Sequence, residues 1–183
     1  MKESDTIHFL DLGSSQIPDR VRELAWHHPK RQFVAVDQHP LWPEEKLPSN
    51  AKYVESDVIQ YMKTLREGSV RIVNADFLLN EMPEEQIREL IGHVKRVLKS
   101  NGKAYFSEDR QNIEDIRKML HEHGFTTFAR DLTKKEAEKP KTFFNEVRIQ
   151  RPQHWRESRK ELPVTWPVRI VATKRIKATR QKD

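Results

Sequence analysis

The sequence predicts an α/β fold, a doubly wound and mostly parallel sheet with an antiparallel strand at its C-terminal edge. From residue 7 to residue 125, short apolar runs alternate with amphipathic stretches of helical periodicity. The last third of the chain then becomes rich in strand-forming residues. Buried parallel strands have nearly continuous apolar sequences, and right-handed crossover helices connect them.

The first strand–helix–strand unit lies at residues 7–37. Ile7–Leu12 and Gln32–Asp37 are apolar runs, and Pro18–His27 carries apolar residues at the spacing of one helix face. Gly13–Ser15, a turn of small residues, follows the first run directly. Open α/β sheets bind ligands outside the carboxyl ends of their strands, so this turn marks the predicted ligand site.

The remaining elements continue the alternation. Residues 38–50 and 150–166 contain prolines and lack a clear period, which predicts loops. Asn101-Gly102 is expected to end the helix that precedes it. We predict one domain over residues 1–174 and a basic tail at 175–183. The expected strands are Lys52–Val54, Val70–Phe77, Lys103–Ser107, Phe125–Phe128, Thr142–Ile149 and Pro167–Thr173, and the expected helices are Val58–Leu65, Pro83–Lys99 and Gln111–His123.

Composition excludes several classes of function. The chain of 183 residues has no cysteine, which excludes disulfides, thiolate metal sites and cysteine nucleophiles. The eight histidines show no ligand spacing, so no metal is expected. No apolar run approaches the roughly 18 residues of a membrane helix. The charged N-terminus has no signal-peptide core, and a cytoplasmic protein without a membrane partner is therefore expected.

The charge distribution suggests a polyanionic partner. The formal net charge is +6, and the chain is markedly basic from Lys134 onward. Trp155 and Trp166 lie among arginines such as Arg156 in this part of the sequence. Basic side chains neutralise phosphates and aromatic rings stack on unpaired bases, as in RNA-binding proteins. The alternative is a solvated basic surface with a loose tail.

Five motifs carry a resemblance to a known family. They are L-D-L-G-S-S (10–15), V-A-V-D-Q (34–38), E-S-D-V (55–58), V-R-I-V-N-A-D-F (70–77) and R-V-L-K-S-N-G-K-A-Y-F-S-E (96–108). In this order and at these spacings, residues 7–173 resemble the class I S-adenosylmethionine-dependent methyltransferases. The resemblance implies a seven-stranded sheet with a terminal antiparallel strand, and S-adenosylmethionine as cofactor.

The acid at the end of the second predicted strand is the strongest candidate for cofactor binding. Asp37 follows Gly13 by 24 residues, within the range at which an acid meets a ribose in dinucleotide-binding proteins of this architecture. One carboxylate can accept from both ribose hydroxyls. The resemblance further implies that Asp57 and Val58 contact the adenine and that Asp11 and Asn74 face the methionine end. The full predicted cofactor set is Asp11, Gly13, Ser14, Ser15, Asp37, Gln38, Asp57, Val58 and Asn74.

Two features leave alternatives open. Strand-end and helix-cap chemistry could also explain Asp37 and Asp57. The first motif of the family is glycine-rich, whereas here Ser14, Ser15 and Gln16 follow Gly13. Side chains at such positions restrict φ. A methyltransferase-like binding protein that has lost catalysis is therefore an alternative to the enzyme.

Methyl transfer from a sulfonium is an in-line displacement, so the protein mainly aligns the reactants and sometimes removes a proton. We predict Asp76 and Glu81 as proton acceptors, because they lie at the end of the fourth predicted strand and just beyond it. Residues 107–116 and the basic character faintly resemble tRNA guanine-N7 methyltransferases, which favours an RNA acceptor over a small molecule or a protein. The candidate substrate-binding residues are Phe77, Asn80, Trp155 and Arg156, with a core or cap role as the alternative for Phe77.

Overall fold

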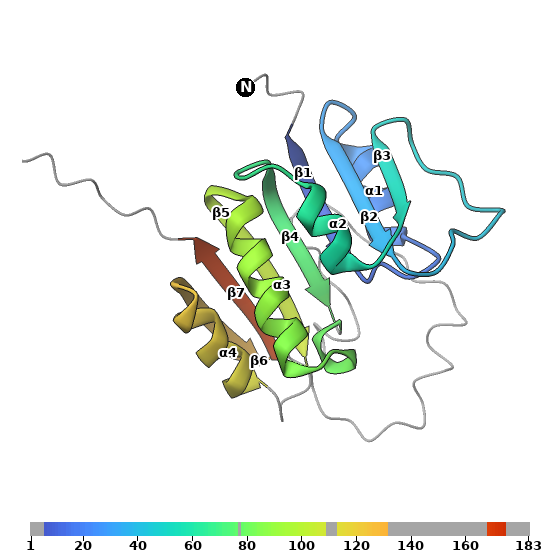
Figure 1. Cartoon of the computed structure of the whole chain (residues 1–183). Coiled ribbons are helices and arrows are strands. Elements are labelled where there is room, and N and C mark those ends of the chain that lie inside the picture. Colours follow the sequence, from blue (N-terminus) through green and yellow to red (C-terminus); the bar gives the residue numbers. More distant parts are fainter. Residues whose placement is uncertain (1–5, 77, 109–112, 132–167, 175–183) are drawn as a thin grey trace, which may run out of the picture.

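The computed structural model describes residues 6–76, 78–108, 113–131 and 168–174, and shows a seven-stranded sheet in the order β3-β2-β1-β4-β5-β7-β6 (Figure 1). Every strand is parallel to β1 except β7, which is antiparallel to both of its neighbours. The predicted fold class is confirmed, and β7 lies one place in from the edge that β6 forms. The strands are β1 Ile7–Leu12, β2 Gln32–Asp37, β3 Ala51–Glu55, β4 Val70–Asp76, β5 Leu98–Glu108, β6 Phe125–Asp131 and β7 Val168–Lys174.

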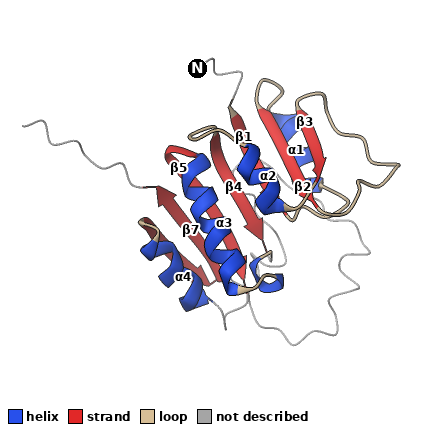
Figure 2. Ribbon diagram, viewed as in Figure 1, coloured by secondary structure: helices blue, strands red, loops and turns tan. Residues whose placement is uncertain are grey.

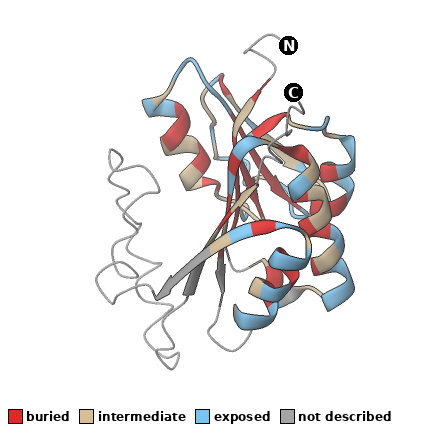
Figure 3. Cartoon of the chain, turned by 90° about the vertical axis from the view of Figure 1, so that its left-hand side faces the viewer, coloured by how far each residue is buried: buried red, intermediate tan, exposed pale blue. Residues whose placement is uncertain are grey.

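Helices cover both faces of the sheet (Figures 2 and 3). Helix α1 (Asp19–His27) packs on one face, and α2 (Val58–Thr64), α3 (Glu84–Val97) and α4 (Ile113–Glu122) pack on the other. Two hydrophobic cores follow from this arrangement, because apolar side chains on each face of the strands meet a different set of helices. The core under α1 contains Phe9, Val21, Leu24, Ala25, Phe33, Ala35 and Ile72.

The core under α1 also fixes which polar side chains reach the ligand edge. Successive side chains of a strand point to opposite faces, so residues two apart share a face. Two positions beyond Phe9 comes Asp11, two beyond Ala35 comes Asp37, and two beyond Ile72 comes Asn74. The alternation therefore places polar residues from three neighbouring strands on the α1 face where these strands end.

The prediction that Asn101-Gly102 ends the helix is wrong. Helix α3 ends at Val97, and β5 begins at the next residue. The register between β4 and β5 shifts here, and Asn101 takes a left-handed φ of 63°. A Cβ atom on Gly102 would lie 3.1 Å from the carbonyl oxygen of Arg71 in β4. The pair is therefore a bulge inside a strand, where two backbones approach too closely for a side chain.

The other elements predicted within the described residues agree with the structure, although several bounds differ. Strands β1 and β2 have the predicted bounds, and residues 38–50 form no helix or strand. Strand β5 begins five residues earlier than predicted, and β6 continues three residues further. The predicted strand Thr142–Ile149, the predicted loop 150–166 and the tail lie outside the described residues.

Asn50 fastens the end of α1 to the sheet. Its buried Nδ2 lies 3.0 Å from the carbonyl oxygen of Ala25, 3.1 Å from that of His28 and 3.0 Å from that of Arg31. The last carbonyl groups of a helix have no partner within the helix, so an outside donor must satisfy them. Asn50 supplies that donor from the residue immediately before β3.

Replacing Asn50 by aspartate should lower the free energy of unfolding by about 1–3 kcal/mol, because a carboxylate cannot donate and would face three carbonyl oxygens. Urea denaturation followed by circular dichroism would measure the change. Gln60→Glu, the same amide-to-acid change at an exposed position of α2, is the control and should shift the value by less than about 0.5 kcal/mol. Equal stability of Asn50→Asp and the original protein would contradict the role of this amide.

Candidate functional site

The predicted cofactor residues meet at the carboxyl edge of the sheet, the edge where β1, β2 and β4 end. From β1 the chain proceeds to β2 and β3 on one side, and it returns to build β4 on the other side. Such a reversal of strand order is the point at which open α/β sheets bind ligands. Asp11, Asp37 and Asn74 are all buried there.

The turn after β1 has the backbone shape of a glycine-rich loop with only one glycine. Gly13 has φ 67° and Ser15 has φ 62°, both in the left-handed region. A non-glycine residue in this conformation costs roughly 1–2 kcal/mol. Ser15 thus keeps the conformation that a second glycine would adopt without strain.

The N–H groups of the turn are bonded within the protein. Those of Gly13 and Ser14 donate to the carbonyl oxygen of Val36, at 2.9 and 3.2 Å. That of Ser15 donates to Oδ2 of Asp37 at 2.8 Å. These hydrogen bonds bind the turn to the end of β2.

Asp37 holds the turn and keeps capacity for further donors. Its Oδ1 accepts from the N–H of His39 at 3.0 Å, while Oδ2 accepts from Ser15. A carboxylate offers roughly four acceptor positions, and these two bonds use one on each oxygen. The strand-end role and the predicted ribose-binding role of Asp37 are thus compatible in this geometry.

A charged cluster connects β1, β4 and α1 beside the turn. Nδ2 of Asn74 donates to Oδ1 of Asp11 at 2.7 Å. One guanidinium nitrogen of Arg20 lies 2.7 Å from Oδ2 of Asp76, and the other lies 3.7 Å from Oδ1 of Asp11. Burial raises the pKa of Asp11 to about 6, although Arg20 and the bond from Asn74 act in the opposite direction. The cluster sets two carboxylates against one guanidinium.

Asn74 also presents an unused acceptor. Its Oδ1 is buried, and among the described residues it has no hydrogen-bond partner. A buried polar atom without a partner costs about 1–3 kcal/mol, so such atoms are rare outside functional sites. This oxygen lies at the point of strand reversal, next to the carboxylate of Asp11.

Arg20 is the residue that the sequence prediction missed. It is the second residue of α1, where a cation opposes the helix dipole. That unfavourable position was the one signal in the sequence. Asp76, its partner at 2.7 Å, lies in a strand that is distant in the sequence, and no local pattern identifies it.

Two surface segments close around the turn. Leu78, which follows β4, lies so near that a Cβ atom on Gly13 would be 3.1 Å from its Cδ1. The indole N–H of Trp42 donates to the side-chain oxygen of Gln16 at 2.8 Å. Arg22 of α1 pairs with Glu45. The loop at residues 38–50 is therefore tied to α1 and to the turn.

The remaining predicted residues lie in several places. Asp57 is exposed and caps α2, accepting from the N–H of Gln60 at 2.9 Å, which is the helix-cap alternative. Val58 is buried in the core under α2. Gln38 is exposed at the end of β2, and Asn80 is exposed in the short helix η2 (Leu79–Glu81). Glu81 ends η2, but its side chain lies outside the described part, as do Phe77, Trp155 and Arg156.

No three His, Asp or Glu side chains within the described ranges gather in an arrangement that could hold a metal ion. None of the described helices combines the length and apolar character that crossing a membrane requires.

Gly13→Ala should lower the free energy of unfolding by about 1 kcal/mol more than Gly68→Ala. Both glycines have a left-handed φ, but a Cβ atom on Gly68 would meet nothing within 4 Å, whereas one on Gly13 would press on Leu78. Parallel urea titrations would give the difference. Equal losses in the two variants would show that Leu78 does not pack against the turn.

The cluster should make stability depend on pH through Asp11. Its pKa is raised in the folded state from 3.8 to about 6, so the folded chain binds the proton more tightly than the unfolded chain. The tighter proton binding contributes fully to the free energy of unfolding below pH 4. This contribution, at most about 3 kcal/mol, is lost as the pH rises through 6. Asp11→Asn removes this titration. The unfolding free energy of the original protein, minus that of Asp11→Asn, should therefore fall between pH 4 and 7, and a constant difference would contradict the raised pKa.

Comparison with known proteins identifies the fold. No family model matches the chain, and no curated protein is similar to it in sequence. An S-adenosylmethionine-dependent methyltransferase from Archaeoglobus fulgidus superposes with a TM-score of 0.62 at 15% identity, over 94% of this chain and 88% of that one. Phosphoethanolamine N-methyltransferase 2 of Haemonchus contortus, in complex with S-adenosyl-L-methionine, gives 0.63 at 15% identity, over 94% of this chain and 49% of that one.

A third structure carries both a substrate and the demethylated cofactor. It is 1,6-didemethyltoxoflavin-N1-methyltransferase of Burkholderia thailandensis, with a TM-score of 0.62 at 12% identity, over 93% of this chain and 72% of that one. The likeness at this level of identity concerns the arrangement of strands and helices. The chain has the fold of the class I S-adenosylmethionine-dependent methyltransferases.

Proposed function

We propose that the protein is an S-adenosylmethionine-dependent methyltransferase whose cofactor site is the carboxyl edge between α1, β1, β2 and β4. The observation that carries this proposal is the buried Oδ1 of Asn74, which has no partner among the described residues and lies beside Asp11 at the point of strand reversal. A ligand that donates a hydrogen bond there would satisfy it.

The residues present fit the chemical groups of this cofactor. Asp37 retains acceptor positions for the two ribose hydroxyls. Asp11 and Oδ1 of Asn74 are acceptors for the ammonium of the methionine end. The cluster has two acids for one guanidinium, and a ligand with positive charge would offset the excess. When bound, the cofactor would supply a methyl group on an activated sulfonium.

The geometry distinguishes the roles of the two predicted proton acceptors. Oδ2 of Asp76 pairs with Arg20, and taking up a proton there would weaken that ion pair. Asp76 therefore suits an electrostatic role, in which it orients Arg20 and keeps negative charge beside the site. Glu81 stays as the proposed general base, at the end of η2 just beyond β4.

We propose RNA as the acceptor. Strand β6 ends at Asp131 and β7 begins at Val168, both at the carboxyl edge, and residues 132–167 connect them. These residues include nine lysines and arginines against five acids, and they contain Trp155 and Arg156. Phosphate neutralisation by the cations and base stacking on the tryptophan are the supporting chemistry.

One observation favours a second candidate, a small neutral or cationic acceptor. The described part of the carboxyl edge is acidic, with Asp11, Asp37, Glu55, Asp57 and Asp76 at or just after strand ends. The activity of a small-molecule enzyme should change little with salt, whereas methylation of RNA should fall steeply as salt rises.

Isothermal titration calorimetry with Asn74→Ala tests the proposed cofactor site. The variant should weaken binding of S-adenosylmethionine about tenfold or more, because a buried acceptor is removed. Binding of 5′-methylthioadenosine, which lacks the amino-acid head, should change by less than about twofold, since Asp37 is intact.

Matched controls keep this experiment interpretable. Lys118→Ala shortens an exposed side chain on α4, outside the predicted cofactor set, and should leave binding of both ligands nearly unchanged. Failure of the original protein to bind S-adenosylmethionine would overturn the proposal. Equal weakening of both ligands by Asn74→Ala would assign Asn74 a structural role instead. Cofactor binding without methyl transfer to any RNA or small molecule in a broad panel would favour the degenerate binding protein.

A further inference from the structure

The opposite edge of the sheet, where the parallel strands begin, carries a row of basic side chains. Its members, which we name the basic row, are Arg31, His8, Arg71 and Lys99. They come from the starts of four neighbouring strands, β2, β1, β4 and β5. Gln32, Ile7, Val70 and Leu98 lie side by side in the register of these four strands. Each member of the basic row is the sequence neighbour of one of these four residues. At about 4.8 Å between strands, the row spans roughly 14 Å.

The cations of the basic row are not used in ion pairs within the described residues. Elsewhere, the described cations often face acids: Lys63 pairs with Glu89 at 2.9 Å, and Arg88 pairs with Glu122 at 2.6 Å. Arg31, Arg71 and Lys99 have no such partner in the described ranges. Arg31 and Arg71 are exposed. A partner can therefore reach their charge.

His8 orients one of these cations while staying neutral. Its Nε2 lies 3.1 Å from a guanidinium nitrogen of Arg31. Burial, together with the smaller effects of the charges of Arg31, Arg71, His28 and Lys99, lowers the pKa of His8 to about 4. The ring is thus neutral at pH 7, and its nitrogen can accept from Arg31. All the charged groups that act on His8 are basic, so the field at this edge is positive.

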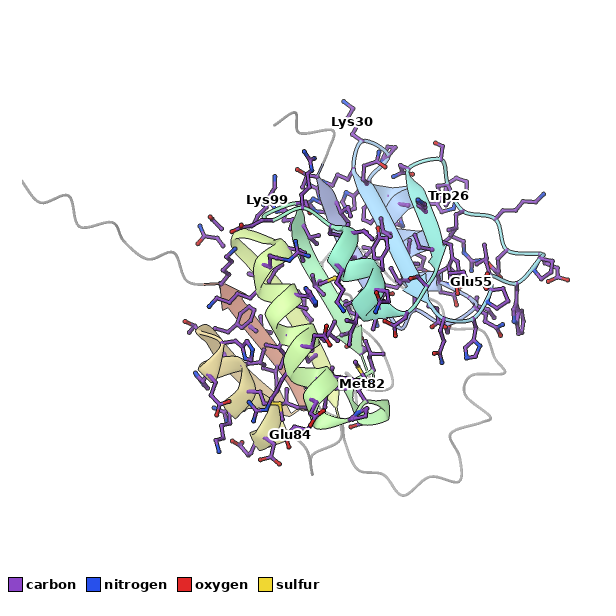
Figure 4. The ribbon with its side chains drawn as sticks, viewed as in Figure 1. Trp26, Lys30, Glu55, Met82, Glu84 and Lys99 are labelled. Carbon is purple, nitrogen blue, oxygen red and sulfur yellow. The ribbon has the colours of Figure 1, made fainter. Side chains whose placement is uncertain are left out.

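The two edges of the sheet have opposite charge. In Figure 4, Lys30 and Lys99 lie at one end of the sheet, and Glu55 and Glu84 lie at the other. Helix dipoles explain part of this pattern, because acids favour helix starts and bases favour helix ends. Arg31, Arg71 and Lys99 belong to no helix, however, and the dipoles do not require them.

We propose that the basic row binds the phosphate backbone of a structured RNA, at a surface separate from the site of methyl transfer. Several cations in line match the repeated charges of a nucleic acid strand, and no base-reading groups are needed for such contacts. Strands of six or seven residues separate the two edges by roughly 20 Å. An RNA that contacts both edges must therefore extend over at least that distance. This inference builds on the RNA acceptor proposed above.

Fluorescence anisotropy with a labelled RNA hairpin of about 20 base pairs tests the inference without requiring methyl transfer. At about 100 mM KCl, the double variant Arg31→Gln/Arg71→Gln should bind at least tenfold more weakly than the original protein. The slope of log Kd against log salt should fall by about two, one for each phosphate that a substituted arginine would neutralise. The Kd for S-adenosylmethionine should be unchanged, because both substitutions lie far from the carboxyl edge.

Arg88→Gln/Lys118→Gln is the matched control, since it removes the same charge from α3 and α4 and should change RNA affinity by less than twofold. An unchanged affinity and salt slope in the first variant, or an equal loss in the control, would overturn the inference. The inference would also be overturned, in favour of a membrane surface, if the original protein bound vesicles with 30% phosphatidylserine but not RNA, and if Arg31→Gln/Arg71→Gln abolished the vesicle binding. If the original protein did not bind S-adenosylmethionine but the RNA affinities changed as expected, the proposed enzyme would be overturned and RNA binding by the basic row would be supported.

Discussion

Two carboxylates on neighbouring strands share one guanidinium, and the candidate site depends on this interaction. Arg20 reaches from α1 to Asp76 at 2.7 Å and approaches Asp11 at 3.7 Å, so it joins the helix to the ends of β1 and β4. The turn between β1 and α1 is held separately by Asp37. Acids near the ends of the strands thus set the position of the helix, the shape of the turn and the charge of the site. They can do so because the alternation of side chains along each strand places these acids on the α1 face of the sheet.

Much of this edge was predictable because the strands that build it are buried. Nearly continuous apolar runs predicted the bounds of β1 and β2, and the acids of the site, Asp11 and Asp37, lie in the last two positions of these strands. What could not be predicted depends on distant neighbours. The bulge at Asn101-Gly102 exists because β4 lies beside it, although the same dipeptide is a common helix stop. Arg20 was missed because its closer partner, Asp76, lies tens of residues away.

The charges of the described residues are not spread evenly: acids and bases gather at opposite ends of the parallel strands. Carboxylates gather where the parallel strands end, and cations without acidic partners among the described residues gather where they begin. The formal excess of +6 therefore does not describe the surroundings of the cofactor site. A polyanion that approaches the described surface would be attracted to one edge and repelled from the other, which orients it before any specific contact forms.

The position of β7 has a consequence for the order of assembly. Because β7 inserts between β5 and β6, the slot that it fills stays empty until the last described strand has been synthesised. Until then β5 and β6 each expose a row of unsatisfied backbone groups, and such open edges invite pairing with other chains. The strands β1 to β4 can pair with one another before β7 is synthesised, whereas β5 and β6 obtain their shared partner only afterwards. Folding of this half of the sheet therefore trails folding of the other half.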